Sequence, residues 1–307
     1  MMQINRRSLL CGLSSALALP ASAAQLSDEE HSGLYSSIQN LLARFEGKLW
    51  LYAKNLDSGA EFGLRADQKV RTASTIKLPI LCALFDLVAA GKVRWDEKLT
   101  LREEDKVSGS GVLHEFSSGT QLAVRDVAHV MIVVSDNTAT NLILDRITAD
   151  AVNDYLDRTG LKITRSLRKV RGDGNDLKPP SGSAKASLLT ENKPYGLGVT
   201  TPREMVALLE LIERGKIVSP AASQEIIAIL KRQQYKEGIG RRRADNVASK
   251  SGALDALRSD VGLVYLPASR LAIAITVDDM PAVDYSPDNA GERLISDLTE
   301  RLVSELG

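Results

Sequence analysis

The chain has few cysteines and no excess of charge of either sign. It contains two cysteines in 307 residues, and Cys11 lies in an N-terminal segment that we expect to be removed. Only Cys82 would then remain, so the mature chain can form no internal disulfide, and a small buried hydrophobe is the expected role of Cys82. Lys and Arg number 39, as do Asp and Glu. This balance argues against nucleic acid as a partner, although residues 241–243 form a short basic run.

A hydrophobic run long enough to cross a membrane is also missing. The apolar stretch from Leu9 to Leu19 is too short for that purpose. Arg6 and Arg7 precede it and the small residues 21–23 follow it. This pattern is typical of an export signal peptide over residues 1–23, of the twin-arginine or the general secretory type. We therefore expect a periplasmic or secreted protein without stable insertion into a membrane.

Metal-binding patterns are lacking as well. His31, His114 and His129 lie far apart in the sequence and show no paired ligand spacing, so we predict no metal site. With 44% hydrophobic and 25% charged residues, the composition is that of an ordinary soluble globular protein. The length allows one large domain or two interleaved ones.

Strand patterns gather toward the two ends of the chain, and helical patterns lie between them. Strands are predicted at residues 48–55, 61–64, 246–251, 261–266 and 271–277. Helices are predicted at residues 29–45, 124–134, 138–147, 202–213, 220–233 and 290–306. The order predicts an α+β fold with an antiparallel sheet flanked by terminal helices and an inserted all-α domain.

We assign residues 28–68 and 214–307 to the sheet domain and residues 69–213 to the helical domain. The helical domain includes a long loop, residues 172–190, that is rich in Gly, Pro, Ser, Lys and Asp.

A further helix is predicted from near Ser74 to near Gly91, because small polar residues come first and a Leu-rich run follows. Ser74 and Lys77 are three residues apart and share a face of this helix. A buried lysine that loses its proton could accept the proton of the Ser74 hydroxyl, which would make a nucleophile. An ordinary amphipathic helix with one exposed lysine is the alternative. Pro79 should remove one helical hydrogen bond and bend the first turns.

Two more short motifs follow the first along the chain. Ser135-Asp136-Asn137 falls in a turn between two predicted helices, where the three residues could simply be helix caps. Lys250-Ser251-Gly252 lies on a predicted strand. In this order, the three motifs resemble the signature set of serine β-lactamases and penicillin-binding proteins. The flanks around Val134 to Leu142, and Lys250 to Ala253 with Arg258 behind them, are most similar to class A β-lactamases.

The resemblance covers about residue 49 to the C-terminus and implies a two-domain serine β-lactamase-like fold. It implies a nucleophile, proton carriers and a carboxylate-binding group for acyl transfer. The implied roles are Ser74 as nucleophile, Lys77 as proton acceptor, Ser135 as proton carrier to the leaving nitrogen, Asn137 as the ligand of the substrate's side-chain amide, the N–H groups of Ser74 and Ala253 as oxyanion donors, and Lys250, Ser251, Gly252 and Arg258 as the carboxylate-binding segment. The resemblance implies no cofactor.

One part of the class A pattern is missing. Those enzymes carry a loop glutamate, followed shortly by an asparagine, that positions the deacylating water. The corresponding stretch here, residues 168–172, reads Arg-Lys-Val-Arg-Gly and has no Glu-x-x-x-Asn. Glu191, Asp173 and Asp176 could each activate water, although each could also be a solvated loop charge. Of these we name Glu191 as the candidate base.

Two main hypotheses follow from the resemblance. The first is a secreted hydrolase that opens β-lactam rings and turns over. The second is a penicillin-binding or peptidase-like or esterase-like protein that is acylated at Ser74 and deacylates slowly. A non-enzymatic binding protein of the same fold ranks third, because all three motifs are intact. In each case we expect a monomer whose ligand is a β-lactam or a related amide or ester.

Overall fold

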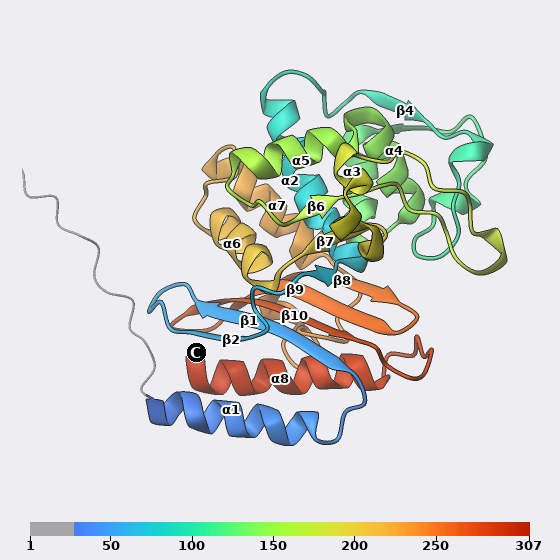
Figure 1. Ribbon diagram of the computed structural model, residues 1–307. Helices are drawn as coiled ribbons and strands as arrows, with labels where there is room; N and C mark the ends of the chain where they lie inside the picture. Colours follow the sequence, from blue (N-terminus) through green and yellow to red (C-terminus); the bar gives the residue numbers. More distant parts are fainter. Residues whose placement is uncertain (1–27) are drawn as a thin grey trace, which may run out of the picture.

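A five-stranded antiparallel sheet forms the lower half of the molecule in Figure 1. The computed structural model describes residues 28–307, so the expected signal peptide at residues 1–23 lies outside the described residues. The strand order is β2-β1-β10-β9-β8, which makes β8 an edge strand. The strands are β1 (Lys48–Asn55), β2 (Glu61–Leu64), β8 (Val247–Leu254), β9 (Leu257–Tyr265) and β10 (Arg270–Asp278).

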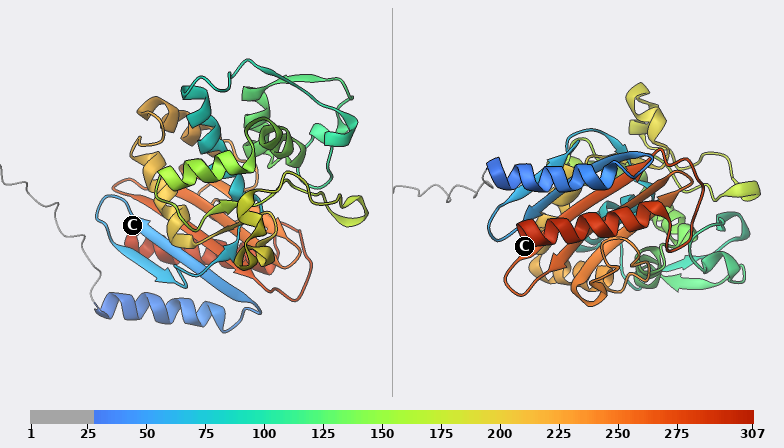
Figure 2. Two further views of the ribbon diagram at one scale, coloured as in Figure 1. Left: turned by 45° about the horizontal axis from the view of Figure 1, so that its top comes forward. Right: turned by 90° about the horizontal axis from the view of Figure 1, so that it is seen from below.

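The two terminal helices cover one face of this sheet. Helices α1 (Asp28–Leu42) and α8 (Ala290–Leu306) lie side by side under the strands (Figures 1 and 2). Leu34 of α1 and Leu298 of α8 are fully buried in the same apolar cluster. Each helix has an apolar stripe formed by residues at steps of three and four, and each stripe is buried against the sheet and the neighbouring helix.

The basic run at residues 241–243 is used within this layer. Each of its three arginines pairs with a carboxylate in or just before α8: Arg241 with Asp288, Arg242 with Asp297, and Arg243 with Glu300. The run therefore fastens the segment before β8 to the C-terminal helix.

A helical layer covers the other face of the sheet (Figure 1). It contains α2 (Lys77–Ala89), α3 (Val124–Val133), α4 (Asn137–Ile147), α5 (Ala149–Arg158), α6 (Pro202–Glu213) and α7 (Pro220–Lys231). Buried side chains of these helices share one apolar cluster with Ala248, Val261 and Ala272 of the sheet. Helix α7 belongs to this cluster through Ile226 and Leu230, although the sequence grouped residues 214–307 with the sheet. The domain boundary itself stays a prediction.

Short strands fix the ends of the loop at residues 172–190. Strands β3 (Val70–Arg71), β6 (Arg165–Ser166) and β7 (Gly198–Thr200) form a small sheet in the order β3-β7-β6. The chain runs from β6 through this loop and returns to β7, which pairs with β3, the strand that leads to Ser74. A separate antiparallel pair is formed by β4 (Lys98–Thr100) and β5 (Gln121–Ala123).

The α+β fold with an antiparallel sheet, terminal helices and an inserted helical layer is confirmed. The expectation that Pro79 removes a helical hydrogen bond is wrong. The α-helix begins at Lys77 after a 3₁₀ turn, so Pro79 is its third residue, where a backbone N–H has no partner within the helix. Between residues 28 and 307, no helix is both long and apolar enough to cross a membrane.

Candidate active site

Ser74 lies in a 3₁₀ turn, η1 (Ala73–Ile76), that runs directly into α2. Side chains three residues apart nearly eclipse one another in a 3₁₀ turn, so Ser74 and Lys77 project from the same side. Ser74 is half-buried. No side chain among residues 28–307 hydrogen-bonds its hydroxyl, which leaves the oxygen open to an incoming carbonyl carbon.

Lys77 is fully buried and points at the second motif. Its Nζ donates to the Ser135 carbonyl oxygen at 2.5 Å, to Ser135 Oγ at 3.2 Å and to Asn137 Oδ1 at 2.9 Å. Three acceptors therefore surround one amine in a site that excludes water. The alternative of an exposed lysine on an amphipathic helix is wrong.

Lys250 reaches the same hydroxyl from the sheet. It is fully buried on β8, and its Nζ donates to Ser135 Oγ at 2.9 Å and to the Ser251 carbonyl oxygen at 2.7 Å. The Ser135 hydroxyl thus lies between two lysines from distant parts of the chain. The fold brings together the three motifs that the sequence singled out, while the chemical role of each residue stays a prediction.

The two lysines have lowered pKa values for the same main reason. Burial lowers the pKa of Lys77 well below its usual value, and the charge of Lys250 lowers it further, while Asp136 opposes the shift. Burial lowers the pKa of Lys250 to about 7, and Asp260 opposes that shift. Desolvation and mutual repulsion therefore favour a neutral amine at Lys77, which is the form that can accept a proton.

Asp136 holds a neighbouring loop onto the second motif, a role that the sequence did not reveal. Its Oδ1 accepts from Ala139 N at 2.7 Å, which caps α4 as the sequence suggested. Its Oδ2 accepts from the backbone N–H groups of Val112 and Leu113 at 2.6 and 2.8 Å. Asp136 is fully buried, so the loop before β5 is fixed against Ser135 and Asn137.

The third motif approaches Ser74 closely because Gly252 has no side chain. A Cβ atom at position 252 would lie 2.9 Å from Ser74 N and 3.1 Å from the Thr72 carbonyl oxygen, which is closer than such atoms normally pack. The backbone of β8 therefore passes directly beside η1. Ala253 follows in the same strand, so its N–H group is a reasonable second donor for an oxyanion at Ser74.

Asn137 is engaged at both ends of its amide. Its Oδ1 accepts from Lys77, and its Nδ2 donates to the Ser108 carbonyl oxygen at 3.1 Å. Its backbone N–H donates to the Ser110 carbonyl oxygen at 2.9 Å. A substrate amide that binds Asn137 must therefore share or replace one of these contacts.

Arg258 does not open onto the cleft. Its side chain is 1% exposed, and its Nη1 donates to the carbonyl oxygens of Leu254 and Leu257 at 2.6 Å each. Its Nη2 donates to the Asp284 carbonyl oxygen. Its implied role as a carboxylate ligand stays a prediction, but this conformation offers a substrate no free face of the guanidinium.

The stretch at residues 168–172 is held by α4. Asn141 Oδ1 accepts from Val170 N at 2.8 Å, and Asn141 Nδ2 donates to the Val170 carbonyl oxygen at 2.8 Å. Glu191 is exposed at the far end of the loop, in the 3₁₀ turn Thr190–Tyr195. No hydrogen bond or ion pair joins Glu191 to another residue of the described chain, and its role as the base stays a prediction.

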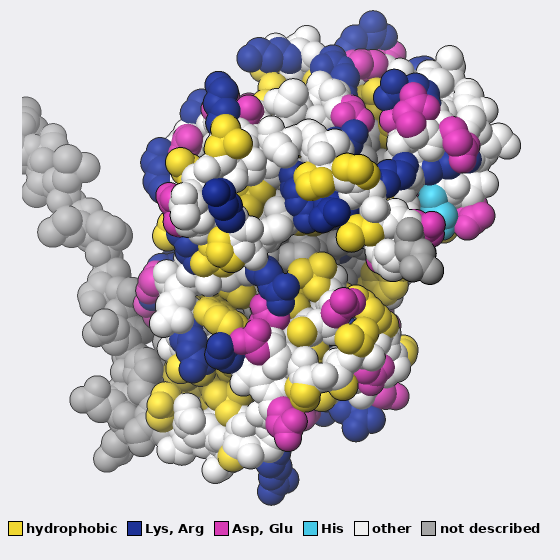
Figure 3. Space-filling model, turned by 45° about the vertical axis from the view of Figure 1, so that its right-hand side comes forward, with side chains coloured by type: hydrophobic (Ala, Val, Ile, Leu, Met, Phe, Trp, Pro, Cys, Tyr) yellow, Lys and Arg dark blue, Asp and Glu magenta, His cyan; other side chains and the backbone are white. Residues whose placement is uncertain are grey.

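Asp173, at the start of the same loop, lies nearer the site. Its Oδ1 accepts from Ser108 Oγ at 2.6 Å, and Ser108 is also the residue whose carbonyl oxygen accepts from Asn137. Lys178 Nζ donates to the Glu104 carbonyl oxygen at 2.8 Å. The loop at residues 172–190 therefore borders the opening of the site. Figure 3 shows the molecule hollowed on this side, between its upper and lower halves.

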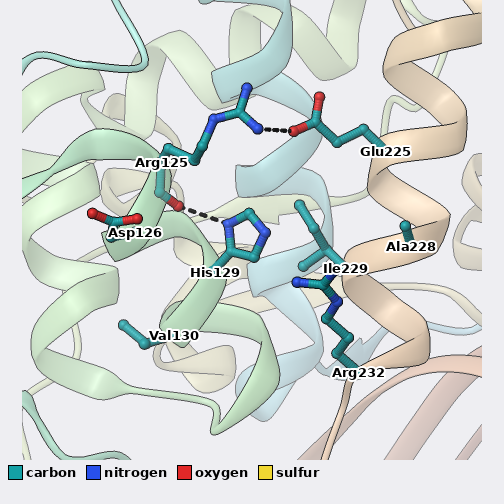
Figure 4. A pocket seen from close by; sticks show the side chains of 8 residues that line it. All are labelled: Arg125, Asp126, His129, Val130, Glu225, Ala228, Ile229 and Arg232. Atoms are coloured by element: carbon teal, nitrogen blue, oxygen red, sulfur yellow. Dashed lines mark hydrogen bonds and ion pairs between the residues drawn. The ribbon is translucent and has the colours of Figure 1, made fainter.

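A separate pocket of about 520 Å³ lies between α3 and α7, away from Ser74 (Figure 4). Arg125 pairs with Glu225 across its mouth at 2.5 Å, and His129 Nδ1 lies 2.8 Å from the Arg125 carbonyl oxygen. None of the residues that line it belongs to the three motifs. Residues 28–307 also contain no group of three or more His, Cys, Asp or Glu side chains placed to hold a metal ion.

Comparison with known proteins points to one family. A family model described as the beta-lactamase enzyme family matches residues 33–306. Beta-lactamase L2 of Stenotrophomonas maltophilia is 24% identical over 213 residues, which are 69% of this chain and 63% of that protein. Beta-lactamase SME-1 of Serratia marcescens is 25% identical over 185 residues, which are 56% of this chain and 61% of that protein. The chain thus spans less than two thirds of the length of these relatives.

Solved structures match over most of the chain. A beta-lactamase from Sphaerobacter thermophilus is similar with a TM-score of 0.76 and 29% identity, over 89% of this chain and 97% of that one. A mutant of PBP-A, solved as an acyl-enzyme complex with penicillin G, is similar with a TM-score of 0.75 and 29% identity, over 93% of this chain and 98% of that one.

Proposed function

Because the chain belongs to the beta-lactamase enzyme family, we propose that it opens β-lactam rings by transferring the acyl group to the Ser74 hydroxyl. The observation that carries this proposal is the Ser135 hydroxyl held between two buried lysines, at 3.2 Å from Lys77 Nζ and 2.9 Å from Lys250 Nζ. Burying two amines around one hydroxyl lowers the stability of the fold, and the same arrangement is suited to proton transfer.

The first step is attack on the carbonyl carbon. Neutral Lys77 takes the proton of the Ser74 hydroxyl as Ser74 Oγ forms the new C–O bond. The N–H groups of Ser74 and Ala253 donate to the oxyanion that develops on the carbonyl oxygen. Burial favours neutral Lys77 before this step, and the site then holds two positive amines beside the negative charge of the intermediate.

The second step is cleavage of the C–N bond of the ring. The leaving nitrogen takes a proton from Ser135 Oγ, and the proton gained by Lys77 replaces it through the 3.2 Å contact. Lys250 donates to the same oxygen throughout, so it stabilises negative charge there while the proton is in transit. Lys250 and Ser251 also offer a cation and a hydroxyl to the substrate carboxylate.

Intact-protein mass spectrometry tests this proposal. Incubation with penicillin G should add the mass of one penicillin to the protein, and Ser74→Ala should abolish the adduct. A matched control is Ser110→Ala, because Ser110 contributes only its backbone carbonyl oxygen to the site. An adduct of equal yield on Ser74→Ala would rule out Ser74 as the nucleophile.

A second candidate function is that of a penicillin-binding or peptidase-like protein that retains its acyl group. The observation in its favour is the lack of a carboxylate at residues 168–172, together with the exposed position of Glu191. Hydrolysis of a chromogenic cephalosporin separates the two candidates. One stoichiometric burst without further turnover indicates slow deacylation, whereas continued hydrolysis indicates a β-lactamase.

We also propose that the protein is exported to the periplasm or secreted and acts as a monomer. The sequence pattern at residues 1–23 supports export, and those residues lie outside the described part of the chain. Fractionation of cells that express the full chain, with Arg6→Lys and Arg7→Lys as a paired variant, tests the twin-arginine route. Light scattering of the purified protein tests the monomer.

A further inference from the structure

Three hydrogen bonds to backbone carbonyl oxygens hold the Arg258 side chain in place. It donates to two carbonyl oxygens of the β8–β9 turn and to the Asp284 carbonyl oxygen. A side chain added at Gly291 of α8 would lie 2.8 Å from Arg258 Cγ, so the stem of the arginine packs tightly against the helix. Arg258 thus joins the end of β8, the loop at residues 279–289 and α8.

Tyr285 covers the remaining face of this guanidinium. Its ring centroid lies 4.6 Å from Arg258 Cζ, and its hydroxyl donates to Asp255 Oδ1 at 2.8 Å. Two contacts therefore fix the ring, yet Tyr285 is 59% exposed. A large apolar surface that is both held in place and open to solvent is suited to contact with a ligand.

Tyr285 also lies beside the proposed active site. Asp255 follows Ala253 by two residues at the end of β8, the edge strand that passes next to Ser74. In the β8–β9 pairing, Ser251 and Ala253 lie on the same face of the sheet as Arg258. Arg258 packs against α8 on that face, so the ring above it lies at the end of the edge strand, on the face to which Ser251 belongs.

The opposite side of the opening is formed by the loop at residues 172–190. The pKa of Tyr285 is raised to about 12, first by burial, then by its hydrogen bond to Asp255 and the charge of that residue, and to a smaller degree by the charge of Asp173. Asp173 is tied to Ser108, whose carbonyl oxygen accepts from Asn137, so this loop borders the Asn137 side of the cleft.

Resting on the acyl-transfer function proposed for Ser74, we propose that Tyr285 is a specificity-determining residue whose exposed ring stacks on an aromatic group next to the substrate carboxylate. Arg258 beneath it is a structural side chain that fixes this ring and does not bind the substrate. The preferred substrate class is then a β-lactam, or a related cyclic amide, with an aryl substituent on the leaving ring.

Two cephalosporins provide a matched test. Nitrocefin and cephalothin share the thienylacetyl group on the acyl side, and they differ at C3, where nitrocefin has a dinitrostyryl group and cephalothin an acetoxymethyl group. The second-order rate constant of Ser74 acylation is measured for both by rapid-quench mass spectrometry. An offset-stacked aromatic pair corresponds to about twofold to tenfold in rate. We expect Tyr285→Ala to slow nitrocefin by that factor and to change the rate for cephalothin by less than about twofold.

Two further variants separate the ring from its supports. Tyr285→Phe keeps the ring and loses the hydrogen bond to Asp255, so it should retain the preference for nitrocefin. Val283→Ala removes an apolar side chain that is 66% exposed in the same loop, and it should leave both rates unchanged. Thermal melting of each variant identifies any loss of folding.

The outcomes are distinct. If Tyr285→Ala slows both substrates equally, or neither, Tyr285 does not select the substituent and the inference is overturned. If Tyr285→Phe loses the preference while remaining folded, the hydroxyl and not the ring is responsible, which also contradicts it. If neither compound acylates Ser74 in the wild-type protein, the acyl-transfer function itself is wrong, and the inference falls with it.

Discussion

Adding a carboxylate at position 170 should speed hydrolysis of the acyl-enzyme. Val170 lies in the stretch that, by resemblance to class A enzymes, would carry the glutamate that positions water. Its backbone is held at both N–H and carbonyl by Asn141, with two bonds of 2.8 Å. Asn141 lies one helical turn after Asn137 on α4, and Asn137 contacts Lys77. A side chain at position 170 is therefore fixed relative to α4, which begins two residues after Ser135.

The size of the effect follows from general base catalysis. A positioned base contributes about 10² to 10⁴ in rate. We expect Val170→Glu to act near the lower end, at about 10²-fold, because Arg168 and Arg171 lie in the same stretch and positive neighbours make a carboxylate a weaker base. Val170 is half-buried, so the variant should lose about 1 kcal/mol of unfolding free energy, which the fold tolerates.

The assay follows the lifetime of the acyl-enzyme. Intact mass spectrometry after mixing with penicillin G measures decay of the adduct, and a chromogenic cephalosporin measures steady turnover. Val170→Gln is the matched control, because it has nearly the same shape and no basic oxygen. A folded Val170→Glu protein that acylates normally and keeps its adduct as long as Val170→Gln does would refute the placement of position 170 beside the ester.

The remaining predictions concern charged groups around the site. The pKa of Lys250 is about 7 in the folded chain against 10.5 for the free side chain, so the unfolded chain binds more protons between these values, and stability measured by urea unfolding should rise with pH across that window. Lys250→Met should abolish acylation and remove this pH dependence, because the group that titrates is gone. A variant with an unchanged pH dependence would contradict the assignment. Asp260→Asn removes a charge that raises the pKa of Lys250 and keeps an acceptor for Ile239 N. The pH above which the acylation rate declines should therefore become lower. An unchanged pH profile would show that Lys250 does not govern this decline. Arg258→Met leaves three carbonyl oxygens without their donor and should cost about 2 to 4 kcal/mol of unfolding free energy; a loss confined to substrate binding would instead restore Arg258 as a carboxylate ligand.

Helices and strands could be predicted from the sequence where the spacing of apolar residues matched the face that the element buries. The closing helix at residues 290–306 and the first strand at residues 48–55 have the predicted bounds, because each has one apolar face and a clear polar boundary. Helix α5 was missed. Thr148 separates it from α4 by a single residue with φ of 70° and caps α5 through its hydroxyl, so no Gly, Pro or longer turn marks the new helix in the sequence.

The three motifs of the site could be predicted from the sequence, but the contacts that hold them in place could not. The spacing of the three motifs and their resemblance to a family indicated that Ser74, Ser135 and Lys250 belong together. The second role of Asp136 depends on where the backbone of Val112 and Leu113 lies, and no local pattern records that. The burial of Arg258 depends on a loop that follows it by more than twenty residues, so the resemblance to class A β-lactamases could not reveal it.

The backbone around the site carries a cost that its function explains. Ala73 and Ser135 both have positive φ, at 46° and 53°, a region that residues with a side chain enter at a cost of about 1 kcal/mol or more each. Tight packing of β8 at Gly252 holds the first, and the hydrogen bonds of Asp136 hold the second. The first strained residue directly precedes Ser74, the proposed nucleophile, and the second is Ser135, the proposed proton carrier. The two buried amines add a desolvation cost at the same place. Backbone strain and buried charge are therefore both concentrated where Ser74, Lys77, Ser135 and Lys250 meet. A substitution that removes the strain or one of the charges should stabilise the protein, but it should also abolish the proposed acyl transfer.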